Sequence, residues 1–176
     1  MTTDVTLKNG DPSSMVVQDP KGAMELIQGW MADRRFYDPA LSPVPIPEGF
    51  HFFMGGKDAN EIPFSVLQPK ELIRTVVVAA NVKLGKEHLD AFNAMKREDR
   101  DNLLWNLQKE IVFASPAFSF NPEYKIDGTF KGIQFVKDIS YDELTEGRLS
   151  EAVSNVTKCV LWVVWTFGRQ FGPPKE

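Results

Sequence analysis

The stretch LSEAVSNVTKCVLWVVWTF, residues 149–167, holds the most regular pattern in this chain of 176 residues. Apolar side chains recur there in steps of 4, 3, 4, 3 and 4 residues, at Leu149, Val153, Val156, Val160, Val163 and Phe167. This spacing predicts an α-helix with one apolar seam. Past Lys158 almost every side of that helix is apolar, so it must be covered on more than one side. We expect it to lie in the middle of the domain or to have one face buried by a second chain.

Two strands are predicted directly upstream of this helix. Residues 117–124 and 130–139 each place aromatic or aliphatic side chains at alternate positions, which is typical of β-strands. Between them lies Asp127-Gly128, a dipeptide that is strongly favoured in hairpin turns. The two segments therefore predict an antiparallel hairpin.

Three further strands are predicted nearer the N-terminus. Residues 50–54 and 62–66 alternate apolar side chains, and residues 74–84 contain the β-branched run typical of a central strand. The connections between these segments are too short for a parallel crossover, so the three strands must be antiparallel neighbours. Gly55 and Gly56 are expected in the turn after the first strand, because no phosphate-binding fingerprint and no helix follows them.

Helical spacing recurs in two other parts of the chain. Residues 19–35 begin with Asp-Pro, a capping residue and a helix-starting proline, and then carry apolar residues at intervals of three and four. The segment after Gly85 has a similar apolar stripe, which is lost near Arg97 within a run of six charged residues. We therefore expect two helices that meet near Arg97, with Asp99 capping the second helix and Pro116 ending it.

The order of these elements is helix, three strands, helix, two strands, helix, which is typical of the α+β class. We predict a single domain over residues 19–172 with a twisted antiparallel five-stranded sheet backed by helices. Residues 1–18 are expected to form a flexible or strap-like N-terminal tail, and residues 173–176 a C-terminal tail. The four prolines within residues 38–49 predict a stiff, extended connector without regular hydrogen bonding.

Composition argues against several kinds of partner. The formal net charge is −4, so no overall positive field attracts nucleic acid or an anionic membrane surface. The longest apolar run, residues 159–167, is too short to cross a bilayer, and the N-terminus lacks the pattern of a secretory signal. Cys159 is the single cysteine and lies in that apolar run, which predicts a buried free thiol in a reducing compartment. We expect a cytoplasmic protein.

The sequence offers few residues for catalysis. His51 lies in a predicted strand and His88 in the first turn of a predicted helix, and neither has a partner at the spacing of a nucleophile or a metal ligand. Asp142, Glu143 and Glu146 are close enough in sequence to converge on a cation or to act as acid and base. We favour a simpler role, in which these carboxylates complement the positive N-terminal end of the last helix. No catalytic residue, metal ligand or cofactor is therefore predicted.

The element order, together with the LLWNL-QKEI helix and the ISYDELTEGRLSEAV segment before the last helix, resembles the type III secretion chaperone-like superfamily. The similarity is to the uncharacterised domain-of-unknown-function proteins of that fold, and it covers residues 21 to about 171. It implies a twisted antiparallel sheet backed by helices, frequent dimerisation, and the activity of holding another polypeptide. The N-terminal tail and the proline connector depart from the compact family pattern, so the resemblance leaves the topology there open.

These observations favour a non-catalytic protein-binding module, chaperone-like or adaptor-like, that binds another polypeptide or a second copy of itself. The large apolar side chains predicted to bind the partner are Phe50, Phe52, Trp105, Trp162 and Trp165. Two alternatives stay open at this point. One is a small subunit of a larger stable assembly. The other is an enzyme or small-ligand sensor whose pocket combines the three carboxylates with Arg100 or Arg148.

Overall fold

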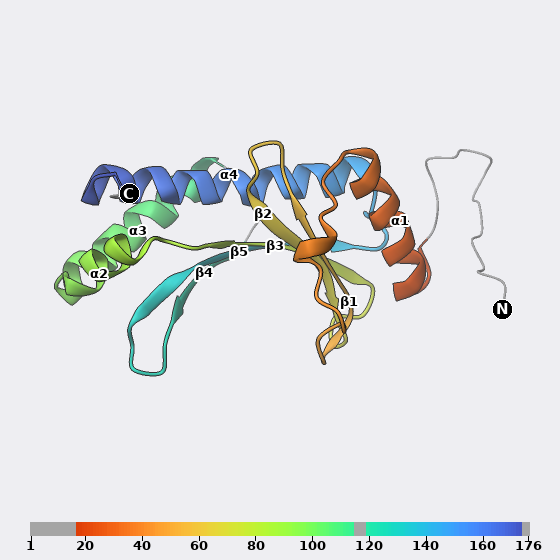
Figure 1. The fold of residues 1–176 in the computed structure, drawn as a ribbon, viewed down its shortest axis with the longest axis horizontal. Helices are drawn as coiled ribbons and strands as arrows, with labels where there is room; N and C mark the ends of the chain where they lie inside the picture. Colours follow the sequence, from red (N-terminus) through yellow and green to blue (C-terminus); the bar gives the residue numbers. More distant parts are fainter. Residues whose placement is uncertain (1–16, 115–118, 174–176) are drawn as a thin grey trace. The chain divides into compact units, whose positions relative to one another are not determined.

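The computed structural model describes residues 17–114 and 119–173 and contains the predicted helices and strands in the predicted order (Figure 1). The middle helical region consists of two helices, as the expected break near Arg97 requires, and the structure adds a short 3-10 helix, η1. The elements are α1 (Pro20–Asp33), η1 (Pro39–Leu41), β1 (Phe50–Lys57), β2 (Pro63–Pro69), β3 (Thr75–Val82), α2 (Lys86–Ala94), α3 (Arg97–Ala114), β4 (Ser119–Tyr124), β5 (Phe130–Ser140) and α4 (Glu146–Phe171).

The strands form one five-stranded antiparallel sheet in the order β1-β2-β3-β5-β4. Both hairpins that the sequence predicts are present, since β1 pairs with β2 and β4 pairs with β5 in antiparallel register. In the second hairpin, the turn at Gly128 has a φ of 80°, and Gly128 N donates to the Lys125 carbonyl at 2.9 Å. The predicted α+β class with an antiparallel five-stranded sheet is therefore confirmed.

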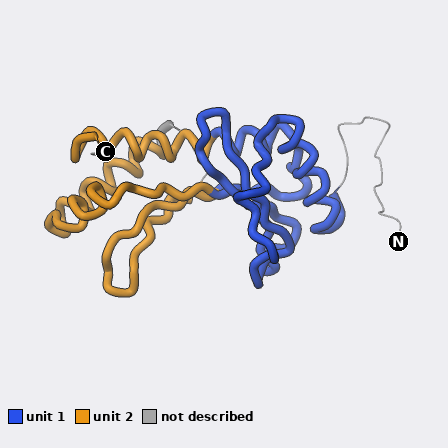
Figure 2. Tube along the Cα trace, viewed as in Figure 1, with its two compact units in different colours: residues 1–79, 137–154 blue, residues 80–136, 155–176 orange. Residues whose placement is uncertain are grey.

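The chain divides into two compact units (Figure 2). Among the described residues, unit 1 contains residues 17–79 and 137–154, and unit 2 contains residues 80–114, 119–136 and 155–173. Elements β3, β5 and α4 each contribute residues to both units. Of the predicted N-terminal tail, residues 1–16 lie outside the described residues, and Val17 is buried. A single domain over residues 19–172 stays a prediction.

In unit 1, α1 begins as its sequence predicts. The Asp19 side chain accepts a hydrogen bond from Gly22 N at 2.7 Å, and Pro20 is the first helical residue. The buried face consists of Ala23, Ile27 and Met31. The connector after α1 differs from the prediction, because η1 forms regular turns within it. Asp38 caps this short helix by accepting a hydrogen bond from Ala40 N at 3.0 Å.

The prediction of a turn at Gly55 and Gly56 is wrong, since both glycines are buried inside β1. A Cβ on Gly55 would lie 2.4 Å from the Leu41 carbonyl oxygen, and one on Gly56 would lie 2.5 Å from the Phe36 carbonyl oxygen. Backbone hydrogen bonds hold residues 36–38 against this end of β1. The glycines therefore allow two backbone segments to approach closely, and the turn follows at residues 58–61.

In unit 2, the helix after Gly85 breaks as predicted, between Ala94 at the end of α2 and Arg97 at the start of α3. The predicted capping role of Asp99 is wrong. Asp99 lies inside the first turn of α3, where a carboxylate complements the positive helix end without capping it. Pro116, predicted to end this helix, lies outside the described residues, as do residues 117–118 of the predicted strand.

Helix α4 contains the predicted seam, and all six seam residues are buried. In unit 2 the seam packs into an aromatic cluster. The ring centroid of Phe167 lies 5.6 Å from that of Phe92, 5.6 Å from that of Phe171 and 6.4 Å from that of Phe130. Asn93 joins α2 to β5, because its amide oxygen accepts from Phe130 N at 2.9 Å. The seam therefore fixes which side of α4 faces outward.

Candidate functional site

The outward side of α4 in unit 2 carries large apolar side chains between two cations. We define the α4 surface as Lys158, Trp162, Val164, Trp165 and Arg169, all of which are exposed. Lys158, Trp162, Trp165 and Arg169 follow one another at steps of 4, 3 and 4 residues, so they lie on one side of the helix, opposite the seam. Trp162 is 39% exposed and Trp165 is 60% exposed.

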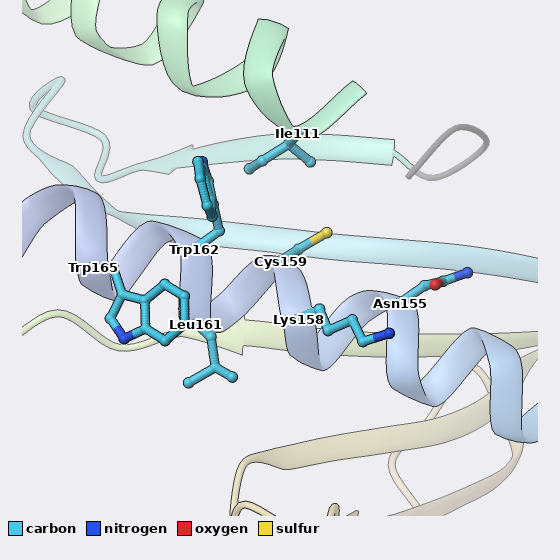
Figure 3. Close-up of a pocket in the computed structure, with 7 residues that line it drawn as sticks. All are labelled: Ile111, Asn155, Lys158, Cys159, Leu161, Trp162 and Trp165. Carbon is cyan, nitrogen blue, oxygen red and sulfur yellow. The ribbon is translucent and has the colours of Figure 1, made fainter. Parts of the chain in front are cut away.

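A hollow of about 300 Å³ lies beside Trp162 (Figure 3). Its lining is mostly apolar, with two polar side chains at one end, and consists of Ile111, Asn155, Lys158, Cys159, Leu161, Trp162 and Trp165. In Figure 3 the side chains of Trp162 and Cys159 extend from α4 toward Ile111 on α3. This lining suits one large apolar side chain of a partner.

Contacts with α3 and within α4 hold the two indole rings. Trp162 Nε1 donates a hydrogen bond to the Glu110 carboxylate at 3.1 Å, which fixes its ring against α3. The rings of Trp162 and Trp165 lie 6.5 Å apart, centroid to centroid, at an angle of 61°. These contacts restrict the orientations of the two rings.

A second, wider hollow of about 740 Å³ lies on the other flank of Trp165. Its apolar lining includes Leu84 and Val164, while Lys83 and Arg169 contribute positive charge. His88 also lines this hollow, but its Nε2 is bonded to the Gly172 carbonyl oxygen at 2.8 Å. That bond ties α2 to the C-terminal end of α4, so His88 has a structural role.

The thiol of Cys159 borders the first hollow, and it is free and buried, as predicted. Burial raises the pKa of this thiol from its ordinary value of 9.0 to about 11. The thiol is therefore protonated at neutral pH, and a protonated thiol is a poor nucleophile. Cys159 contributes apolar surface to the hollow.

The three carboxylates near the start of α4 do not form a shared site in unit 1. Asp142 bonds to Arg74 Nη2 at 2.9 Å, and Glu146 accepts from Arg34 Nε at 2.7 Å. Glu143 is exposed. Within residues 17–114 and 119–173, no three His, Cys, Asp or Glu side chains are grouped so as to hold a metal ion. His51, on β1, is exposed.

The structure separates the residues that the sequence assigned to partner binding. Trp162 and Trp165 lie together on the α4 surface, and Trp105, 65% exposed, lies on α3 of the same unit. Phe50 is half-buried in β1 of unit 1, with its ring against Phe53. Phe52 is only 1% exposed, so it is a core residue and not a contact residue. The alternation pattern could not show this, because it marks a shared face without showing which face is outward.

Ile111, Lys158 and Cys159 were missed as lining residues of a site. Lys158 and Cys159 precede Trp162 by four and three residues, so helical spacing alone could have grouped them with it. Ile111 comes from another helix, and no local pattern links it to α4.

None of the helices within the described residues combines the length and apolar character needed to span a membrane.

These features define an α+β protein whose described surface includes an apolar, tryptophan-bearing helix face. The profile of an uncharacterised conserved protein family, DUF2299, matches residues 23–167, and the chain belongs to this family. No curated protein matches the chain. The part of the predicted resemblance that concerns an uncharacterised family is therefore confirmed.

Several solved structures are similar to this chain at low sequence identity, and the two with TM-scores above 0.5 share its fold. An uncharacterised protein from Methanothermobacter thermautotrophicus has a TM-score of 0.72 and 20% identity, over 85% of this chain and 99% of that chain. YbjN from E. coli has a TM-score of 0.51 and 9% identity, over 86% and 96%. The type III secretion chaperone SycH from Yersinia pestis, solved with a fragment of YscM2, has a TM-score of 0.45 and 8% identity, over 79% and 97%. Membership of the secretion-chaperone superfamily stays a prediction.

Proposed function

We propose that this chain is a non-catalytic protein-binding module that holds a segment of another polypeptide on the α4 surface. The observation that carries the proposal is the pair of exposed, oriented tryptophans, Trp162 and Trp165, beside a hollow lined by apolar groups. Tryptophan is among the residues that contribute most to binding energy at protein interfaces. An apolar surface held open in this way is typical of a contact site for another chain.

The exposed area is large enough to anchor a partner. A tryptophan side chain covers up to about 250 Å², so exposed fractions of 39% and 60% leave roughly 250 Å² in total. At about 25 cal/mol per Å², covering this area would contribute roughly 6 kcal/mol before the cost of association. Two side chains can therefore supply the centre of an interface, with the surrounding residues excluding water.

The chemistry of the site supports binding rather than catalysis. The thiol beside the hollow is protonated, the nearby histidine ring is bonded to a backbone carbonyl, and two of the candidate carboxylates are each bonded to an arginine. Trp105 and Phe50 are proposed as further contacts outside the α4 surface.

Differential capture tests this function. The full chain, the double variant Trp162→Ala/Trp165→Ala and the control Ile126→Ala would each be used to retain proteins from an extract of the native source. Ile126 is fully exposed in the turn between β4 and β5, so its change removes apolar area far from α4 in sequence. The proposal predicts that a polypeptide retained by the full chain and by the control is lost with the double variant.

Each retained polypeptide would then be purified and titrated against the same three proteins, with Trp105→Ala added to test the further contact. The expected result is at least a tenfold weaker affinity for the double variant. Equal affinities for all variants would overturn the proposal that the α4 surface is the binding site.

A further inference from the structure

The α4 surface and the wider hollow carry cations that form no ion pair within the described residues. Lys158 and Arg169 are exposed at either end of the tryptophan pair, and Lys83 lines the wider hollow. None of the three takes part in an ion pair in the part of the chain that the structure describes. On α4, the positions three and four residues from Lys158 and from Arg169 contain no Asp or Glu.

The α4 surface differs from the chain as a whole in the sign of its charge. The chain has a formal net charge of −4, whereas the five residues of the α4 surface include two cations and no acid. Glu110 on α3 places one carboxylate beside Trp162, where it accepts a hydrogen bond from the indole N–H. A local excess of cations on an acidic protein selects partners by charge as well as by apolar contact.

Given the proposed function, the geometry points to one class of occupant, a polypeptide segment in which a large apolar residue is flanked by Asp or Glu. The apolar side chain enters the hollow between Trp162 and Ile111. The acidic side chains lie toward Lys158 at one end and toward Arg169 and Lys83 at the other.

The helix sets the spacing of those acids. Lys158 and Arg169 are eleven residues apart, which corresponds to roughly 16 Å along α4. An extended segment covers this distance in about five residues, and a helical segment in about eleven. Acids at one of these two spacings, with an aromatic or aliphatic residue between them, are therefore the expected recognition pattern.

A peptide-display selection tests this inference without knowledge of the natural partner. Random peptides of 16 residues would be selected on the full chain, after depletion on the Trp162→Ala/Trp165→Ala variant to remove sequences that bind elsewhere. A second selection would use Lys158→Glu/Arg169→Glu, and a third the control Lys125→Glu, which changes an exposed turn residue. Circular dichroism would establish that each variant is folded.

The expected result is enrichment of Asp and Glu around an apolar residue on the full chain and on the control, and of Lys and Arg on the double charge variant. A selected acidic peptide should bind the double charge variant about tenfold more weakly than the full chain, with less difference at high salt.

Enrichment of apolar peptides without acidic bias would overturn the inference and leave the proposed function standing. Failure to enrich any peptide that depends on Trp162 and Trp165 would overturn both. A dimer in sedimentation that the tryptophan variant converts to a monomer would assign the surface to a second copy. Displacement of the acidic peptide by a synthetic peptide of residues 1–16 would assign the α4 surface to the chain's own N-terminal segment. Either result contradicts the inference.

Discussion

Replacing Phe167 or Trp165 by alanine should lower the free energy of unfolding by very different amounts. Phe167 is on the buried side of α4, and Trp165 is on its exposed side. Phe167 is fully buried and lies against three other phenylalanine rings. A Phe-to-Ala change in a core costs about 3 to 5 kcal/mol, and the loss of several ring contacts places Phe167→Ala near about 4 to 5 kcal/mol. This is a large part of the about 5 to 15 kcal/mol that stabilises a typical domain.

The same estimate for Trp165 is much smaller. Because 60% of Trp165 is exposed, the rest of the protein buries about 100 Å² of its side-chain surface. At about 25 cal/mol per Å² the loss is bounded at about 2.5 kcal/mol. The actual loss should be smaller for two reasons: alanine still buries part of this area, and the unfolded chain already buries some of its surface. We therefore expect Trp165→Ala to lower the free energy of unfolding by about 1 kcal/mol.

Urea denaturation followed by circular dichroism measures both values. With a slope of about 2.5 kcal/mol per M, the midpoint should fall by roughly 1.8 M for Phe167→Ala and by roughly 0.4 M for Trp165→Ala. Equal losses for the two variants would show instead that Trp165 is a core residue and is unavailable to a partner.

Three further predictions concern the fold and its titrating groups. Gly56→Ala should cost about 1 to 3 kcal/mol in thermal or chemical unfolding because its Cβ would meet a carbonyl oxygen, whereas Gly29→Ala, with open space around it, should stabilise α1 by up to about 1 kcal/mol. Burial raises the pKa of the Cys159 thiol from 9.0 to about 11, so the unfolded chain loses this proton at a lower pH than the folded chain. The thiol should therefore make no pH-dependent contribution below about pH 8 and should reduce the free energy of unfolding by about 2 kcal/mol as the pH rises to about 11. The difference between the full chain and Cys159→Ala across that range measures this effect. Tyr141→Phe should cost about 1 to 3 kcal/mol in urea unfolding, because the hydroxyl of this buried tyrosine donates to the side-chain oxygen of buried Gln68 at 2.5 Å, and the change leaves that oxygen without this donor.

The main elements of the fold could be predicted because their patterns are local. The α4 seam repeats within one segment, and the turn at Gly128 has its own dipeptide signal. The error at Gly55 and Gly56 has a non-local cause, since only the approach of residues 36–41 requires glycine inside β1. Two adjacent glycines after a short apolar run are otherwise typical of a turn.

The candidate site could be predicted only in part, for a similar reason. Trp162 and Trp165 could be identified because they are large apolar residues that lie outside the six-residue seam of α4. The hollow beside them depends on Ile111 of another helix, and its charge depends on which cations lack an ion-pair partner. Phe52 was misplaced because a strand pattern does not show which face is buried.

Site-specific photo-cross-linking can show whether Trp165 contacts another polypeptide. A photoreactive phenylalanine derivative would replace Trp165 in one version of the full chain and Ile126 in another, and each would be irradiated in an extract of the native source. If the α4 surface binds a partner, position 165 gives a discrete cross-linked polypeptide that position 126 does not give and that an acidic apolar peptide displaces. Absence of a cross-link at position 165, or the same products from both positions, would contradict it.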